Sequence, residues 1–159
     1  MSDDAHESQD NPGVIAPPPL IYAGALAIGL LANVLYPISF LPRGLSRLLG
    51  WPLIVGGLVI GSLGFREMKR AGTNVDPKEP TTAIVTEGPY RFTRNPLYLC
   101  LTLVYAGISA IANSLWAVLL LPGVLAVMRR GVIEREERYL ERKFGGEYLN
   151  YKARVRRWI

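Results

Sequence analysis

The chain has 159 residues, of which 50% are hydrophobic and 19% are charged, with a formal net charge of +5 at pH 7. Its single cysteine, Cys100, excludes an internal disulfide, and its single histidine, His6, lies in an acidic N-terminal stretch. We therefore expect no metal site. The basic residues lie beside apolar blocks rather than on a soluble basic face, which argues against nucleic acid as a partner.

Three long blocks contain no charged residue: 13–42, 48–65 and 95–128. A bilayer core about 30 Å thick needs about 20 apolar helical residues per span. Backbone groups inside it must bond within their own helix, because no water is available there. A soluble helical bundle would carry charges on its outer faces, so these blocks predict an all-α integral membrane protein.

The chain begins with an acidic and then proline-rich segment, residues 1–18, which we expect to be disordered. Residues 19–159 should form a single membrane domain. The first span should cover about residues 19–41, with Pro37 bending its end, and the second about residues 47–65.

The third block has 34 residues, enough for a helix of about 51 Å, which is longer than a bilayer needs. Asn113 and Ser114 near its middle predict a turn followed by a helix N-cap. We therefore expect a hairpin of two spans, about 96–112 and 114–128. A hairpin also places the arginines that flank the two ends of the block on one side of the membrane.

With four spans, the distribution of basic residues predicts the orientation of the chain in the membrane. Of the 18 basic residues, 16 lie in the loop from Arg66 to Arg94 or after Met128. Because basic residues are retained on the cytoplasmic side, we expect the second loop and both termini to be cytoplasmic. A cytoplasmic amphipathic helix should follow at about residues 130–144.

The cytoplasmic loop contains a short β-prone stretch, residues 81–86, and a turn at residues 87–89. Pro96 then opens the third span at the favoured first helical position, so the helix N-terminus faces the loop and can receive an anion. Arg91 and Arg94 add positive charge there. The alternative is that these two arginines are positive-inside anchors only.

The C-terminal amphipathic helix places Glu136 and Glu137 on the two shoulders of its apolar stripe. Carboxylates in such positions need a positive partner. Two readings remain open. Glu136 and Glu137 either pair with Arg91, Arg94 or Arg130, or bind a cationic ligand.

Three motifs carry a family resemblance: Gly88–Tyr98 (GPYRFTRNPLY), the pair Glu136-Glu137, and Phe144–Tyr151 (FGGEYLNY). In order and spacing they resemble the isoprenylcysteine carboxyl methyltransferase and phospholipid methyltransferase superfamily of membrane enzymes, over residues 73–158. The resemblance implies S-adenosyl-L-methionine as methyl donor, in a pocket made by the loop, the start of the third span and the C-terminal helix.

The resemblance also implies roles for individual residues. Glu136 matches the acidic position that holds the donor, and Glu137 beside it is expected to hold Arg94 or Arg130 in place. The full donor-binding set would be Thr82, Ala83, Ile84, Val85, Tyr90, Asn95, Pro96, Leu97, Tyr98, Glu136 and Glu137. The catalytic set would be Arg94, Asn95 and Arg130, with Arg130 near the basic position associated with the acceptor.

One departure limits the chemistry. The superfamily's Arg-His-Pro reads Arg94-Asn95-Pro96 here, so no imidazole base is available, although Asn95 can donate and accept hydrogen bonds. Carboxylate or thiol acceptors therefore rank above amines, which must lose a proton first.

The function implied is that of a membrane methyltransferase resembling isoprenylcysteine carboxyl O-methyltransferases. It would act on a lipophilic or membrane-associated acceptor that enters from the bilayer, with membrane lipids as partners. One alternative is a phospholipid N- or small-thiol S-methyltransferase. Another, from a different class, is a non-catalytic membrane scaffold or assembly protein with the same fold. The sequence leaves the oligomeric state open.

Overall fold

The computed structural model describes residues 12–76 and 79–159, and this part of the chain contains helices but no strand. The α-helices are α2 (Pro18–Leu35), α3 (Arg43–Arg70), α4 (Pro96–Ile111), α5 (Leu115–Met128), α6 (Glu134–Phe144) and α7 (Gly146–Arg154). A 3₁₀ turn, η1 (Gly88–Arg91), precedes α4, and a π-helical turn, η2 (Arg129–Ile133), joins α5 to α6. The prediction of an all-helical fold is confirmed.

Three helical segments are long and apolar enough to cross a membrane: Pro18–Leu35, Arg43–Arg70 and Leu115–Phe144. The apolar helix Pro96–Ile111 is shorter. The fold is therefore that of a helical membrane protein with three to four long apolar helices. Many large apolar side chains face outward, among them Val34 (78% exposed) and Leu48 (69% exposed), as expected of surfaces that contact lipid.

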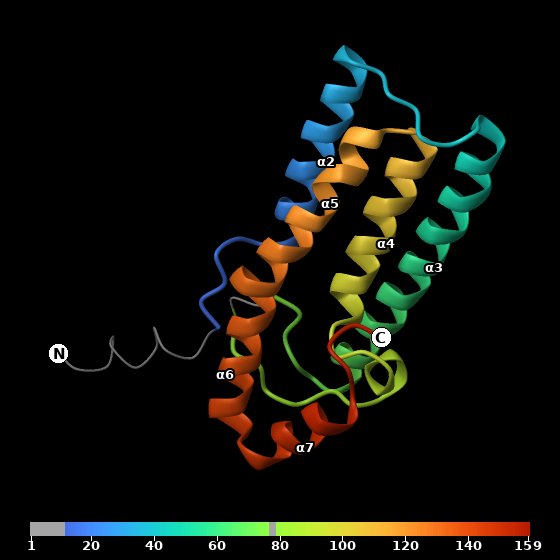
Figure 1. The fold of residues 1–159 in the computed structure, drawn as a ribbon. Helices are drawn as coiled ribbons and strands as arrows, with labels where there is room; N and C mark the ends of the chain where they lie inside the picture. Colours follow the sequence, from blue (N-terminus) through green and yellow to red (C-terminus); the bar gives the residue numbers. More distant parts are fainter. Residues whose placement is uncertain (1–11, 77–78) are drawn as a thin grey trace.

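The four apolar helices lie side by side, with α6, α7 and the loop between α3 and α4 at one end of the bundle (Figure 1). We call this the cavity end. The connections at 36–42 and 112–114 form the opposite end, which we call the turn end. Helix α3 packs mainly on α4, and α2 mainly on α5, whereas α2 and α3 make at most a marginal contact.

A face of small residues on α3 packs against α4. A Cβ atom at Gly57 would lie 3.0 Å from the Cys100 carbonyl oxygen, and one at Gly61 would lie 2.6 Å from the Cys100 sulfur. Helices can approach this closely only where a side chain is absent. The two glycines therefore hold α4, and the functional residues at its N-terminus, close against α3.

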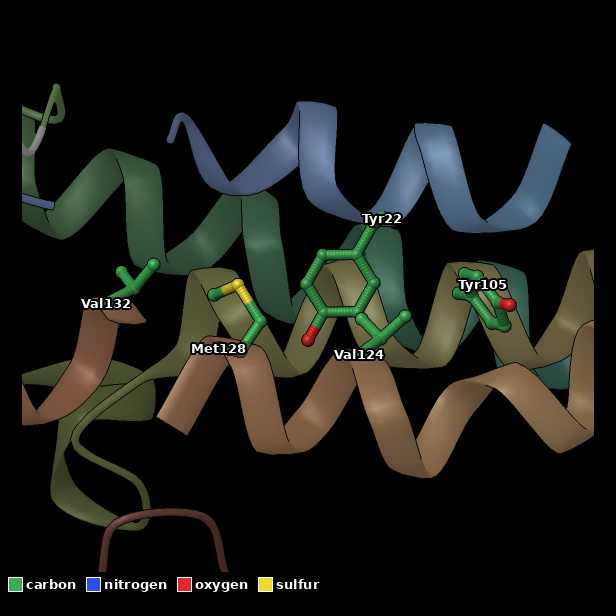
Figure 2. Packing of buried hydrophobic residues seen from close by; sticks show 5 residues of the cluster. All are labelled: Tyr22, Tyr105, Val124, Met128 and Val132. Atoms are coloured by element: carbon green, nitrogen blue, oxygen red, sulfur yellow. The ribbon is translucent and has the colours of Figure 1, made fainter. Parts of the chain in front are cut away.

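The buried core lies between α2, α4 and α5 and continues into η2, through Tyr22, Tyr105, Val124, Met128 and Val132 (Figure 2). Both tyrosine hydroxyls are satisfied inside it. The Tyr22 hydroxyl lies 2.7 Å from the Thr102 hydroxyl, and the Tyr105 hydroxyl donates to the Ala117 carbonyl at 2.8 Å. Polar groups in an apolar core need such partners, so these bonds fix how the helices align.

The turn of the predicted hairpin is present, with α4 ending at Ile111 and Ser114 capping α5 by accepting a hydrogen bond from the Ala117 amide at 3.2 Å. Helix α2 covers only the first part of the predicted segment 19–41, whereas α3 contains the whole of the predicted segment 47–65. Helix α2 ends at Leu35, because the residue before Pro37 is driven out of the helical region. Helix α3 spans Arg43–Arg70, because the charged residues at both of its ends continue the helix beyond the apolar block.

The predicted amphipathic helix at 130–144 also needs correction. Helix α6 begins at Glu134 and continues the direction of α5 through η2, as Figure 1 shows. Helix α7 follows after Gly145, whose φ of 55° allows the reversal, and it was not predicted.

Most of the N-terminal segment predicted to be disordered, residues 1–18, lies outside the described residues, and so does His6. Residues 12–17 are described. They form no helix, and the Ile15 amide donates to the Gly131 carbonyl at 3.2 Å, so this part of the segment lies across η2.

Candidate functional site

A cavity of about 130 Å³ lies at the cavity end, between the loop after α3, the start of α4, α6 and α7. It brings together most of the residues predicted to bind the donor or to act in catalysis. The predicted residues that line it are Ala83, Ile84, Val85, Tyr90, Arg94, Asn95, Pro96, Leu97, Tyr98, Glu136 and Glu137.

Two predicted residues do not line this cavity. Thr82 instead fastens the loop onto itself, with its hydroxyl donating to the Gly72 carbonyl at 2.9 Å and its amide donating to the Thr73 hydroxyl at 3.1 Å. Arg130 is exposed on η2. It therefore takes no part in the cavity wall.

The described residues of the loop, up to 76 and from 79 onward, form no β-strand, although residues 81–86 had a β-prone sequence. The Thr81 amide donates to the Tyr139 hydroxyl of α6 at 3.2 Å, and Thr73 is buried beneath the loop. Figure 1 shows the loop running across the cavity end between α3 and α4. The loop thus forms one cavity wall that is attached to α6 through side chains.

Glu136 is partly buried, and the Tyr98 hydroxyl donates to its carboxylate at 2.5 Å. Helix α6 carries eight charged residues and lies beyond the apolar segment that ends at Met128, so this carboxyl group lies outside the membrane-spanning part. Burial raises the pKa of Glu136 to about 7, against the hydrogen bond from Tyr98, and the nearby Glu137 charge adds to the rise. Glu136 therefore changes charge near neutral pH.

Glu137 has a different environment. Its side chain is buried, with Arg94 Nη2 at 3.2 Å from Oε1 and Arg157 donating to both oxygens, Nε to Oε1 at 2.9 Å and Nη2 to Oε2 at 2.7 Å. The pairing with Arg94 matches the sequence interpretation. Arg157 occupies the second place, for which the sequence had suggested Arg130.

Asn95 is engaged by the C-terminal arm, residues 155–159. Its side-chain amide donates to the Arg157 carbonyl at 2.9 Å, and the Thr93 hydroxyl donates to the same oxygen at 3.2 Å. The Arg94 amide donates to the Arg156 carbonyl at 3.0 Å. The arm therefore lies against the segment just before α4 and connects it to Glu137 on α6.

Sequence reasoning missed several residues of this site. Tyr139, Tyr148 and Tyr151 line the cavity, and Tyr151 donates from its hydroxyl to the Tyr90 carbonyl at 2.8 Å. Burial raises the pKa of Tyr148 to about 12. The two tyrosines of α7 belong to the quoted FGGEYLNY motif, so the signal was present without a role. Arg157 lies among basic residues near the C-terminus, and the sequence analysis assigned it no role.

A second cavity, of about 730 Å³, opens between the start of α2 and α3. Its walls are mostly apolar and include Leu58, Phe65 and Leu101. Four residues border both cavities, namely Val75, Asp76, Leu97 and Tyr98. The groove and the polar cavity are therefore adjacent and share this part of their walls.

The fold and the site define a helical membrane protein with a polar cavity beside its apolar bundle, and comparison with known sequences assigns its family. Residues 45–147, more than half of the chain, match the phospholipid methyltransferase family. The chain belongs to this family of membrane methyltransferases. No solved structure matches it.

Several curated proteins match parts of the chain. The cobalt-zinc-cadmium resistance protein CzcN of Cupriavidus metallidurans is 38% identical over 72 residues, which are 45% of this chain and 33% of that protein. The nickel-cobalt-cadmium resistance protein NccN of Alcaligenes xylosoxydans xylosoxydans is 35% identical over 75 residues, 47% of this chain and 35% of that protein. An uncharacterized protein of Haemophilus influenzae is 54% identical over 35 residues, 22% of this chain and 56% of that protein. The chain thus spans about a third of the first two relatives.

Proposed function

We propose that the protein transfers a methyl group from S-adenosyl-L-methionine to a lipophilic acceptor, and that the donor occupies the cavity between the loop, α4 and α6. Family membership supports methyl transfer. The observation that carries the donor assignment is the convergence of Glu136 and Arg94, groups of opposite charge, on one cavity. A donor with a cationic sulfonium and amino group and an anionic carboxylate matches both.

The cavity must widen to hold the whole donor. Its volume of about 130 Å³ is below the range of about 300–1,000 Å³ that is common for ligand pockets. The loop between α3 and α4 is the wall that can move most easily, since it has no strand and its described attachment to α6 includes the Thr81–Tyr139 bond. Donor binding should therefore displace this loop outward.

The protein contributes positioning and electrostatics rather than a strong base. When bound, the donor supplies an electrophilic methyl group on a sulfonium sulfur. Glu136 would hold the cationic part of the donor, and the apolar cavity residues Ala83, Ile84 and Leu97 would exclude water from it. Alignment of two reactants in a closed site is worth about 7–11 kcal/mol of the barrier.

The acceptor is proposed to lie in the groove between α2 and α3. The groove is mostly apolar, residues from the start of α2, from α3 and from α4 line it, and it meets the donor cavity at Val75, Asp76, Leu97 and Tyr98. A hydrocarbon chain in the groove would bring its head group to the donor. This arrangement favours an amphiphile over a water-soluble acceptor.

Two classes of acceptor remain as candidates, and they differ in the chemistry of the head group. The isoprenylcysteine-type acceptor would present a carboxylate, which already carries its nucleophilic electron pair. A phospholipid-type acceptor would present an amine. Asp76 is the charged residue among the four that border both cavities, and it repels a carboxylate but attracts an ammonium. The ammonium would release its proton to water before its nitrogen accepts the methyl group, and the donor would leave as the neutral thioether. That placement favours the amine candidate, in agreement with the family's description.

The donor assignment is tested by titrating S-adenosyl-L-methionine into detergent-solubilised wild type, Glu136→Gln and Glu147→Gln. Loss of one charge-assisted contact costs about 1.5–3 kcal/mol, so Glu136→Gln should bind roughly ten- to a hundredfold more weakly. Glu147 is exposed and does not line the cavity, so its variant should bind like wild type. Equal affinity in all three would remove Glu136 from the donor site. Folded wild type that binds no donor would instead support a non-catalytic scaffold.

The acceptor is tested in membranes that contain the protein. After incubation with methyl-labelled donor, label in an amine-bearing lipid would support the phospholipid-type candidate. Label released by base as a methyl ester would support the carboxylate candidate. An Asp76→Asn variant should lower transfer to the amine by a larger factor than it weakens donor binding.

A further inference from the structure

Arg94 is a buried cation with incomplete hydrogen bonding. Its side chain is 8% exposed and lines the cavity. Nη2 contacts Glu137, whereas Nε and Nη1 are buried without a hydrogen-bond acceptor. The Tyr148 hydroxyl interacts with the Arg94 guanidinium through a hydrogen bond and through its charge, and both lower the pKa of Tyr148, but neither Nε nor Nη1 has an acceptor in hydrogen-bond geometry. Leaving buried charged donors unpaired is costly, so an arrangement of this kind calls for a ligand.

Arg157 explains why Arg94 remains incompletely paired. A guanidinium normally binds a carboxylate through two parallel hydrogen bonds. Arg157 takes this position on Glu137, with Nε on Oε1 and Nη2 on Oε2. Arg94 is therefore restricted to a single contact, Nη2 to Oε1 at 3.2 Å.

The charges around Glu137 also indicate that Arg94 is incompletely paired. One buried carboxylate, Glu137, serves two guanidinium groups, and Lys152 Nζ lies 3.9 Å from its Oε2. Lys152 and Arg157 are satisfied further out, by Glu141 and Glu134 respectively. Arg94, at the cavity wall, is therefore the cation whose ion pair in the described part of the chain is limited to the shared Glu137.

We infer that Nε and Nη1 of Arg94 form a carboxylate-binding site, and that Arg157 is a positioning residue that creates this site by occupying Glu137. The inference rests on the proposed function for its ligand, the α-carboxylate of the methyl donor. Glu136 lies on the same cavity and would take the donor's cationic part, so the two charged ends of the donor's amino-acid moiety meet opposite charges.

The C-terminal arm gains a role from this arrangement. Three hydrogen bonds join residues 93–95 to the carbonyls of Arg156 and Arg157, so the arm is held where its guanidinium reaches Glu137. Asn95 is one of these anchors. Its side-chain donor is thus used to position Arg157, which assigns Asn95 a structural contribution to donor binding in place of a part in the chemistry.

The test compares two ligands that differ only in the carboxylate, S-adenosyl-L-methionine and decarboxylated S-adenosylmethionine. Their dissociation constants are measured for wild type, Arg157→Gln, Arg157→Lys and Arg154→Gln in one detergent, with melting curves for each. Arg154 is an exposed arginine whose side chain donates to the Asn150 carbonyl, so its variant reproduces the charge change without touching Glu137.

Wild type and Arg154→Gln should prefer the complete donor by roughly tenfold or more. In Arg157→Gln, Arg94 is free to pair with both oxygens of Glu137, so affinity for the complete donor should fall about tenfold while affinity for the decarboxylated ligand changes less than twofold. Arg157→Lys keeps the charge and should restore part of the preference.

Several outcomes would overturn the inference. Equal weakening of both ligands in Arg157→Gln would indicate a merely structural residue, and an unchanged preference would separate Arg157 from Arg94. If Arg157→Gln does not fold, Arg94→Lys replaces it and must lose the same preference. If wild type binds both ligands equally, the carboxylate site is refuted but the proposed function is not. If wild type binds neither ligand, both the carboxylate site and the proposed function are refuted.

Discussion

The two ends of the helix bundle differ in how completely their polar groups are hydrogen-bonded. At the turn end, the Asn113 side chain accepts from the Phe40 and Leu41 amides at 3.1 and 3.0 Å and donates to the Leu41 carbonyl at 2.7 Å. Trp116 adds a bond to the Tyr36 carbonyl at 2.7 Å. At the cavity end, two nitrogens of Arg94 lack acceptors and Glu136 borders a cavity. The contrast teaches that unsatisfied groups are concentrated where a ligand is expected.

The largest expected effect concerns the location of the two ends. The count of basic residues predicts that the turn end and the cavity end lie on opposite sides of the membrane, with both termini cytoplasmic. Reporter fusions in the 112–114 turn and at the C-terminus should therefore show an all-or-none difference. Activity of both reporters on one side would refute the four-span arrangement.

The next effect is on stability at the cavity end. Glu137→Gln removes the carboxylate between Arg94 and Arg157 and leaves the buried guanidinium of Arg94 without its ion-pair partner. We expect a loss of about 3–5 kcal/mol, because breaking one side of a buried ion pair leaves an uncompensated charge. Thermal or denaturant unfolding in detergent would measure it.

The exposed Glu147→Gln variant is the control for this comparison, with an expected change within about 0.5 kcal/mol. Similar stability of the two variants would show that the ion pairs of Glu137 with Arg94 and Arg157 do not stabilise the fold.

At the turn end, Asn113→Ala should cost about 1–3 kcal/mol, because three hydrogen bonds are lost and Asn113 has a φ of 49°. Asn113→Gly also loses the three bonds but adopts positive φ without strain. It should therefore be the more stable of the two variants. Unfolding at the same detergent concentration gives both values, and donor affinity should remain that of wild type. A weakened donor affinity would show that the two ends are coupled.

Sequence reasoning could predict much of the fold because it rests on solvent physics. Charge-free blocks, the Asn113-Ser114 turn and the position of Pro96 at the start of α4 each follow from a local requirement for buried backbone groups or for a helix start. The same reasoning placed Glu136 and Glu137 on the apolar shoulders of one helix. Their need for positive partners then followed from burial.

The remainder depends on contacts between distant segments. Arg157 is 20 positions from Glu137 and 63 from Arg94, and no periodicity connects it to either. The continuation of α5 into α6 through η2 depends on packing, and the position of the 36–42 connection depends on the Asn113 side chain, 72 positions from Leu41. Tertiary contacts determine these features, so local sequence patterns do not predict them.

The smallest expected effect is a pH dependence of donor binding. Burial raises the pKa of Glu136 to about 7, so the neutral carboxyl group is favoured below neutral pH. A cationic donor group requires the ionised form. Donor binding should therefore release a proton near pH 7, and affinity should fall about tenfold from about pH 8 to about pH 6, where roughly one carboxyl in ten is ionised.

The stability of the unliganded protein should change in the opposite direction. A carboxyl group with a pKa above its unfolded value contributes stability that is fully present below the unfolded pKa and is lost as pH rises through the folded pKa, here about 7. Without donor, the contribution of Glu136 thus makes wild type more stable at about pH 6 than at about pH 8, relative to Glu136→Gln. Titration calorimetry and melting at both pH values would measure the two trends, and Glu136→Gln should abolish both. If affinity and stability instead fell together at low pH, protonation elsewhere would be responsible, and Glu136 would not be the group that recognises the donor's positive charge.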